Sequence, residues 1–366
     1  MREPKIIISG GGTGGHIFPA VAIANALREA LPDAQILFVG AEGKMEMERV
    51  PKAEYDIVGL PIRGFQRSKP VTLPITLFKL LKSLRMARKL LKKENPAVVV
   101  GVGGYASAAV LHQAAKMKIP TLIQEQNSYP GITNKLLANK AKKICVAYDN
   151  MERFFPKEKL FFLGNPIRQD LLDKNIDKVE AFKYYGLDST KKTVLVVGGS
   201  LGARTLNESL KRNLDFLGKQ NFQIIWQSGA YYYEQLKGQI NDTCPSNVHL
   251  FKFLDRMDWA YSVADIVVSR AGALTISELS VLGKSTILVP SPNVTEDHQT
   301  KNAMALVKKE ATILVKDEDA EQNLVPKVIQ LMKAEERRKQ LATQILYFAK
   351  PNAANDIANE VIKLMK

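Results

Sequence analysis

The stretch KIIISGGGTGGHIFPAVAIANAL, residues 5–27, reads as a buried strand, a glycine-rich loop and an amphipathic helix. A second stretch, KTVLVVGGSLGARTLNESL at residues 192–210, has the same pattern. After each stretch, short apolar runs alternate with helical segments; the runs lie at 36–39, 55–58, 98–102, 121–124 and 144–147, then at 223–227, 248–251, 266–269, 286–289 and 312–315. Alternating strands and helices predict parallel sheets covered on both faces, so we expect an α/β chain with two Rossmann-like domains.

Length and composition agree with this organisation. A chain of 366 residues is long for one hydrophobic core, and 46% hydrophobic with 24% charged residues is typical of a globular protein. The domains are expected at 1–165 and 166–349, with the junction near Gly164-Asn165-Pro166. A last helix, within 350–366, could pack back on the first domain, and the sequence leaves this open. No apolar run is long enough to span a membrane, and two cysteines fit a reducing cytoplasm.

The formal charge of +15 is concentrated in one segment. Residues 57–93 hold ten Lys or Arg and no acid, and 75–93 have the apolar spacing of an amphipathic helix. Such a segment suits an anionic membrane surface or a nucleic acid, and the alternative is a solvated helix face. The aromatic and basic interleaving of an RNA-binding module is missing, so the membrane is favoured.

The first glycine loop, Gly10 to Gly15, allows close backbone approach, and the helix after it offers N–H groups to a phosphate. Together with Glu42 it also matches the dinucleotide fingerprint of a dehydrogenase, although weakly. His16 ends the loop and could accept a proton from a sugar hydroxyl, or could simply cap the helix. The other histidines share no metal-ligand spacing.

The second half has comparable features. Ser200 stands in the loop GGSLGA, where a phosphate could bind or where a plain turn serine would suffice. Glu278 lies early in the helix that follows Gly272, so its carboxylate could accept the hydroxyls of a ribose or complement the helix dipole. The loop 296–302 suits sugar hydroxyls. The acids at 317–319 are better explained as the opening of a helix than as a metal centre.

Seven motifs occur in order along the whole chain: GGTGGH at 11–16, GVGGYAS at 101–107, QEQNSYPGITNK at 124–135, GNPIR at 164–168, GGSLGA at 198–203, RAGALTISE at 270–278 and EDHQTKNA at 296–303. Together they closely resemble the MurG transferases of glycosyltransferase family 28. That resemblance implies a GT-B fold with two domains facing across a cleft. It also implies an inverting transfer of GlcNAc from UDP-GlcNAc to undecaprenyl-pyrophosphoryl-MurNAc-pentapeptide, lipid I, which gives lipid II in peptidoglycan synthesis. No metal or cofactor is implied.

The resemblance also implies roles for individual residues. The positions matching the UDP-GlcNAc site are Thr13, Gly14, Gly15, Asn127, Arg168, Ser200, Leu254, Ala273, Leu274, Thr275, Glu278 and Gln299. The positions matching the acceptor side are Gly103, Gly104, Tyr105, Glu125 and Asn134. His16 is the first choice of catalytic base and Glu125 the second. His298 stands beside Gln299 where some members have a second Gln, which leaves one sugar contact open.

The expected partners are UDP-GlcNAc, lipid I and an anionic membrane surface contacted through 63–93, with no nucleic acid. The expected location is peripheral, on the cytoplasmic face of the bacterial inner membrane. Three alternatives remain open on the sequence: a related UDP-sugar transferase with another lipid acceptor, such as diacylglycerol, a UDP-GlcNAc 2-epimerase, and a dehydrogenase.

Overall fold

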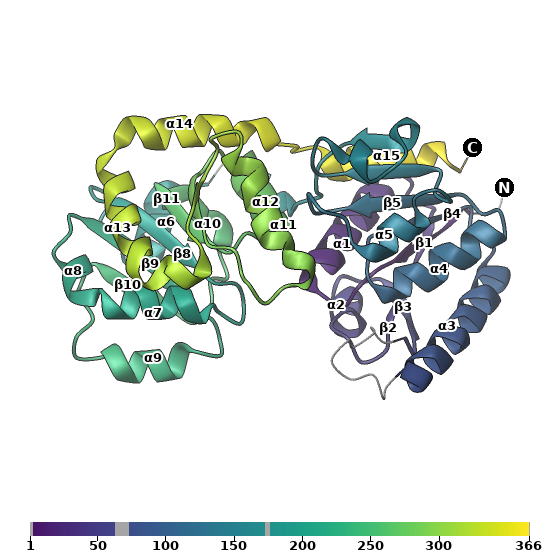
Figure 1. The fold of residues 1–366 in the computed structure, drawn as a ribbon, viewed down its shortest axis with the longest axis horizontal. Helices are drawn as coiled ribbons and strands as arrows, with labels where there is room; N and C mark the ends of the chain where they lie inside the picture. Colours follow the sequence, from purple (N-terminus) through teal and green to yellow (C-terminus); the bar gives the residue numbers. More distant parts are fainter. Residues whose placement is uncertain (1–2, 63–72, 173–175, 366) are drawn as a thin grey trace. The chain divides into compact units, whose positions relative to one another are not determined.

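A computed structural model describes residues 3–62, 73–172 and 176–365 of the chain, which forms two compact units (Figure 1). The first unit comprises Met1–Arg168 together with Lys350–Lys366, and the second comprises Gln169–Ala349. The chain therefore changes unit after Arg168, three residues beyond the predicted junction. The C-terminal helix belongs to the first unit, which answers the question that the sequence left open.

Within its described residues, the first unit contains a seven-stranded parallel sheet in the order β3-β2-β1-β4-β5-β6-β7. The strands are β1 (Lys5–Ser9), β2 (Gln35–Ala41), β3 (Asp56–Leu60), β4 (Val98–Gly101), β5 (Thr121–Glu125), β6 (Lys143–Val146) and β7 (Leu160–Phe162). The helices are α1 (Gly14–Ala30), α2 (Glu46–Lys52), α3 (Leu73–Glu94), α4 (Tyr105–Lys116), α5 (Ile132–Leu137) and α15 (Ala353–Lys363).

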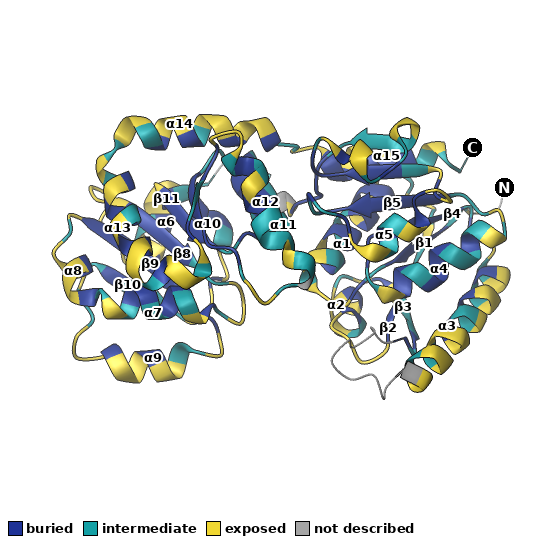
Figure 2. Ribbon diagram, in the orientation of Figure 1, coloured by how far each residue is buried: buried dark blue, intermediate teal, exposed yellow. Residues whose placement is uncertain are grey.

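The central strands of this sheet are buried on both faces, because successive side chains point to opposite sides. Ile7 contributes to a core with α3 and α4, whereas Ile6 and Ile8 contribute to a core with α1 and α15. Helix α15 packs along α1. Its fully buried Ile357 and Val361 belong to the same apolar cluster as α1, so the last helix completes the first unit's core (Figure 2).

In the described part of the second unit, a six-stranded parallel sheet has the order β10-β9-β8-β11-β12-β13. Its strands are β8 (Lys192–Val197), β9 (Phe222–Gln227), β10 (Val248–Phe251), β11 (Ile266–Ser269), β12 (Ser285–Leu288) and β13 (Ile313–Leu314). Its helices are α6 (Lys178–Tyr184), α7 (Arg204–Arg212), α8 (Leu214–Gly218), α9 (Tyr233–Ile240), α10 (Met257–Val263), α11 (Ala273–Val281), α12 (His298–Val307), α13 (Ala320–Lys333) and α14 (Glu335–Ile345).

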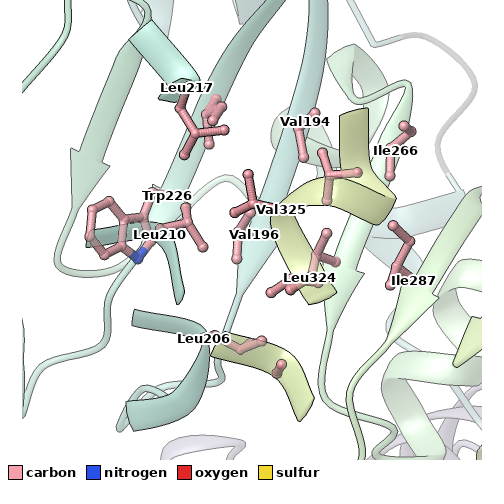
Figure 3. Packing of buried hydrophobic residues seen from close by; sticks show 14 of the residues in the cluster. Val194, Val196, Leu206, Leu210, Leu217, Trp226, Ile266, Ile287, Leu324 and Val325 are labelled. Atoms are coloured by element: carbon pink, nitrogen blue, oxygen red, sulfur yellow. The ribbon is translucent and has the colours of Figure 1, made fainter. Parts of the chain in front are cut away.

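One core of the second unit packs strands β8, β9 and β11 against α7 and α13 (Figure 3). Its largest side chain is the fully buried Trp226. The indole N–H of Trp226 donates to the Asn207 amide oxygen at 2.9 Å, so its polar group is satisfied inside the core. This packing holds β8 and β11 side by side, and both strands lead into loops of the candidate site.

The predicted parallel α/β architecture is confirmed, and the ends of the predicted strands shift by only one or two residues. Strand β7 was not predicted, because its three half-buried residues carry too short a pattern. The predicted helix 75–93 corresponds to α3, but its apolar stripe does not pack over its whole length. Leu77, Leu80 and Leu81 are exposed, whereas Ala87 and Leu91 are buried against the domain. None of the helices in the described ranges is long and apolar enough to cross a membrane.

Candidate active site

In the first unit, the loops that follow β1, β4 and β5 meet at the carboxyl edge of the sheet. A Cβ built on Gly104 would lie 2.6 Å from the Gly11 carbonyl oxygen, so the β1 and β4 loops touch backbone to backbone. Gly104 has φ +87°, so both its conformation and its close contact require glycine. The Gln126 side-chain amide donates to the Val102 carbonyl oxygen at 3.0 Å and joins the β5 loop to the β4 loop. Three motifs that are far apart in sequence thus form one surface at the edge of the sheet where ligands of parallel α/β domains bind.

His16 lies in the first turn of α1 and is half-buried. Its Nδ1 is 2.9 Å from the carbonyl oxygen of Gly11, and a carbonyl oxygen can only accept. Nδ1 therefore carries the proton in the neutral ring, and Nε2 keeps its lone pair. A Cβ on Gly103 would lie 2.9 Å from Nε2, so this nitrogen stands beside the β4 loop. The alternative of a helix cap is wrong, because the ring bonds a carbonyl oxygen and the N-cap position belongs to Thr13.

Glu125, at the end of β5, is only 1% exposed. Its Oε1 accepts from the backbone N–H and side-chain amide of Asn127, at 3.0 and 3.2 Å. Its Oε2 accepts from the Gly131 N–H at 3.1 Å and the Asn134 side-chain amide at 2.7 Å. Four donors thus engage both oxygens and close the segment 126–134 around the carboxylate. Asn134, an expected acceptor-side residue, is itself buried in this network.

The remaining first-unit candidates are more accessible. Within residues 3–62, which are all described, no side chain caps the N-terminus of α1 and its first turn holds no acid. Gly14 and Gly15 begin that helix, so their N–H groups and the helix dipole can attract an anion. Thr13, Tyr105 and Arg168 are exposed.

In the second unit, the loop carrying Ser200 is held by backbone contacts. The Ala230 N–H donates to the Ser200 carbonyl oxygen at 3.1 Å. A Cβ on Gly202, which has φ +89°, would lie 2.0 Å from the Ser228 carbonyl oxygen. The Ser200 side chain is exposed just before α7 begins at Arg204. A fixed loop with an outward hydroxyl ahead of a helix can bind a phosphate group.

Helix α11 follows β11 through Gly272, and the described residues provide no side-chain cap for it. Ala273, Leu274 and Thr275 form its half-buried first turn. Glu278 lies one turn further, and its Oε2 accepts from the Tyr261 hydroxyl at 3.1 Å. This contact orients the carboxylate from α10, which the sequence did not reveal.

Leu254 precedes α10 and its side chain is buried, so a ligand contact of this residue would use its main chain. Nearby, Arg256 donates to both carboxylate oxygens of Asp258. Burial works against the charged form of Asp258, but the hydrogen bonds from the Arg256 guanidinium and from backbone N–H groups, together with the positive charge of Arg256, outweigh it and hold the pKa of this carboxyl below its ordinary value. The segment carrying Leu254 is thereby anchored to α10.

The loop after β12 is strained just before α12, the helix that carries Gln299. Glu296 and Asp297 have φ of 56° and 51°, a region that non-glycine residues avoid. The Gln299 Oε1 accepts from the Ser291 N–H at 2.8 Å, so its NH2 is the half of the amide that can donate to a sugar hydroxyl. Adjacent strained residues of this kind occur at ligand sites.

The acidic segment 317–319 binds neighbouring side chains of the second unit through Asp317. Asp317 accepts from the Arg270 guanidinium and from the Thr205 hydroxyl, the latter at 2.9 Å. It thus links the ends of β11 and α7. Among the described residues, no three His, Cys, Asp or Glu side chains come together as a metal site would require.

Comparisons with known proteins match this arrangement. Residues 6–146 match the glycosyltransferase family 28 N-terminal domain, and residues 193–361 match the family 28 C-terminal domain. The chain belongs to glycosyltransferase family 28. With the family model and the fold in agreement, the GT-B architecture predicted from the motifs is confirmed.

The relatives are similar over their full length. A protein of Parabacteroides distasonis is 53% identical, covering 100% of this chain and 99% of its own; one of Flavobacterium psychrophilum is 50% identical, with the same coverage. Both are named UDP-N-acetylglucosamine--N-acetylmuramyl-(pentapeptide) pyrophosphoryl-undecaprenol N-acetylglucosamine transferase. The crystal structure of Acinetobacter baumannii MurG has a TM-score of 0.80 at 27% identity and covers 98% of this chain and 99% of its own. A Neisseria meningitidis UDP-GlcNAc 2-epimerase shares the fold alone. Its crystal structure has a TM-score of 0.68 at 16% identity and covers 98% of this chain and 100% of its own.

Proposed function

We propose that this family 28 chain transfers GlcNAc from UDP-GlcNAc to the C4 hydroxyl of the MurNAc in undecaprenyl-pyrophosphoryl-MurNAc-pentapeptide, forming lipid II. The observation that carries the assignment is the 53% identity, across the whole chain, with a relative named for this transfer. The transfer inverts the anomeric centre and gives a β-1,4 link. The enzyme thereby supplies the disaccharide unit of peptidoglycan.

The first unit is proposed to supply the catalytic base. His16 Nε2 takes the proton from the acceptor hydroxyl, whose oxygen then attacks the anomeric carbon from the face opposite UDP. The Nδ1 contact with Gly11 supports this role, because it leaves Nε2 as the acceptor nitrogen. Glu125 is the weaker candidate, because four N–H groups already occupy its two oxygens.

The second unit is proposed to hold most of the donor. The exposed Ser200 and the N-terminus of α11 would bind the diphosphate, Glu278 the ribose hydroxyls and Gln299 the GlcNAc. The bond from the anomeric carbon to the diphosphate breaks with its electron pair on UDP. Helix N-termini and the exposed Arg168 can stabilise that charge, and each such donor typically contributes about 2.7–4 kcal/mol to lowering the barrier.

A UDP-release assay with and without a lipid I analogue tests the function. We expect UDP release to depend on the analogue and to be matched by a lipid II-type disaccharide product. Release that depends on diacylglycerol in place of lipid I would identify the related transferase. Conversion of UDP-GlcNAc with no acceptor would identify the epimerase and contradict the proposal.

The membrane location is proposed from α3. Ile75, Phe78 and Leu81 are exposed in its first half, with Phe78 at 66%, beside the exposed Lys82 and Arg85. A basic helix with uncovered apolar side chains suits the anionic cytoplasmic leaflet, where the lipid acceptor is anchored. The predicted contact segment 63–93 is described only from 73 onward, because 63–72 lie outside the described residues.

Reversing the charge of Lys82, Arg85 and Lys89 to Glu is expected to weaken binding to anionic vesicles about 100-fold or more, since each basic residue near the surface contributes about 1 kcal/mol. Turnover of a water-soluble acceptor analogue is expected to stay near the parent value. Vesicle co-sedimentation and the soluble assay provide the two measurements.

The matched control reverses Lys116, Lys118 and Lys142, which are exposed in the same unit and carry the same charge. It is expected to bind vesicles much more tightly than the α3 variant. If both triple variants lost the same amount of vesicle binding, the effect would be one of net charge and not of the α3 surface. Loss of soluble turnover in the α3 variant would make this helix structural.

A further inference from the structure

Glu46, the first residue of α2, is a buried carboxylate beneath the first glycine loop. It is only 1% exposed. Its Oε2 accepts from the Gly12 N–H and its Oε1 from the Ala41 N–H, both at 2.9 Å. A Cβ on Gly11 would lie 2.2 Å from Glu46 Oε1, and one on Gly40 would lie 2.5 Å from Glu46 Cγ. Two glycines therefore make room for one acid, whose oxygens bind the loop on one side and the end of β2 on the other.

The peptide group between Gly11 and Gly12 connects this carboxylate to His16. Its N–H donates to Glu46, and its carbonyl oxygen accepts from His16 Nδ1 at 2.9 Å. The N–H and C=O of a trans peptide point in opposite directions, so one rigid unit spans the two side chains. Hydrogen bonds in such a chain polarise one another, and an ionised acceptor at one end makes the carbonyl oxygen at the other a stronger acceptor.

The dihedral preferences of the two loop residues do little to orient this peptide. Both residues that flank it are glycines, at φ +149° and +87°, and glycine adopts positive and negative φ with similar ease. Turning the peptide over would point the Gly11 carbonyl oxygen at the Glu46 carboxylate and would remove the acceptor from His16. The charge of Glu46 therefore opposes the flipped state and favours the observed one.

We propose that Glu46 is a positioning residue for His16, acting through the Gly11–Gly12 peptide. This inference rests on the proposed function of His16 as base. The carboxylate holds the peptide so that the neutral imidazole keeps its proton on Nδ1, and Nε2 is left to accept the proton of the attacking hydroxyl. The proton moves from hydroxyl to Nε2, the new C–O bond forms, and the bond to UDP breaks with its electron pair on the leaving group. Glu46 takes no part in the proton transfer, and the polarised Gly11 carbonyl stabilises the imidazolium.

Nitrogen-15 NMR of histidine-labelled protein tests the proposal directly, because the ring nitrogen shifts distinguish the two neutral tautomers. Only four histidines are present, and the H16A variant assigns the signal of His16. In the parent protein we expect the neutral ring to carry its proton on Nδ1. In E46Q, which keeps the side-chain size and removes the charge, we expect a substantial Nε2–H population. A parent ring protonated on Nε2 overturns the proposal without any Glu46 variant.

Kinetics provide the second measurement. E46Q is expected to lose roughly 10- to 100-fold in kcat, the range known for partners that orient a metal-bound histidine, with little change in the KM for UDP-GlcNAc. The matched control is E48Q, which removes an exposed carboxylate from the same helix and is expected to change neither tautomer nor kcat. An unchanged tautomer in E46Q overturns the proposal whatever its kcat. The NMR experiment needs no substrate, so it tests the Glu46 proposal alone. The proposed function would be refuted by a different experiment, the activity assay that identifies another acceptor or another base.

Discussion

Replacing His16 by alanine is expected to lower kcat by about 10²- to 10⁴-fold, the contribution of a positioned general base. The affinity for UDP-GlcNAc is expected to change little, because most of the proposed donor contacts, such as Glu278 and Gln299, belong to the second unit. The side chain is half-buried and makes one short contact, to the Gly11 carbonyl oxygen, so its loss leaves the apolar core intact. Steady-state kinetics with a lipid I analogue and UDP-GlcNAc titration of the free enzyme measure the two quantities.

His112, on α4, provides the matched control. It is also half-buried, and H112Q removes an imidazole from the same unit without touching the glycine loops. Its kcat is expected to remain near that of the parent protein. If H16A retained full turnover, the proton would have another acceptor. If instead H16A lost donor affinity and kept kcat, His16 would be a binding residue.

The fold was largely predictable because its signal is local. Buried parallel strands such as 98–102 and 266–269 are continuous apolar runs, and each glycine loop marks where a strand gives way to a helix. The destination of the C-terminal helix was not predictable. Its apolar face fits any core with a free groove, and only the assembled first unit shows that Ile357 and Val361 join α1.

The candidate site was predictable only in part. The glycine loops and their ligand-binding geometry follow from sequence, since φ above 0° and close approach require glycine. The side-chain contacts that support these loops could not be predicted from the sequence. Glu46 reaches Gly12 from 34 positions away, and Tyr261 reaches Glu278 from another helix, so neither pairing leaves a pattern along the chain. The exposure of Leu81 on α3 was likewise hidden, because an apolar stripe reads the same whether or not a neighbour covers it.

Glu125→Gln is expected to destabilise the first unit and to lower turnover together. The carboxylate accepts from four N–H groups in a site where it is almost fully buried, whereas a glutamine has one acceptor oxygen and an NH2 that must face donors. Leaving a buried donor unpaired costs about 1–3 kcal/mol each, so the loss of two contacts amounts to about 2–6 kcal/mol. At about 2–4 °C for each kcal/mol in a domain of this size, the unfolding midpoint is expected to fall by at least about 4 °C.

This pattern separates a structural carboxylate from a catalytic one. If Glu125 organises the segment 126–134, E125Q changes the KM for the acceptor as well as kcat, because Gly131 and Asn134 lose their common anchor. If it is the base, the same hydrogen bonds are lost, but kcat falls by about 10²- to 10⁴-fold while the KM for the acceptor stays near the parent value. The control is E152Q, an exposed glutamate of the same unit, for which neither quantity should move. Acceptor kinetics distinguish the two roles, and calorimetry on the same preparations measures the expected fall in the unfolding midpoint. A loss confined to kcat would transfer the role of base from His16 to Glu125.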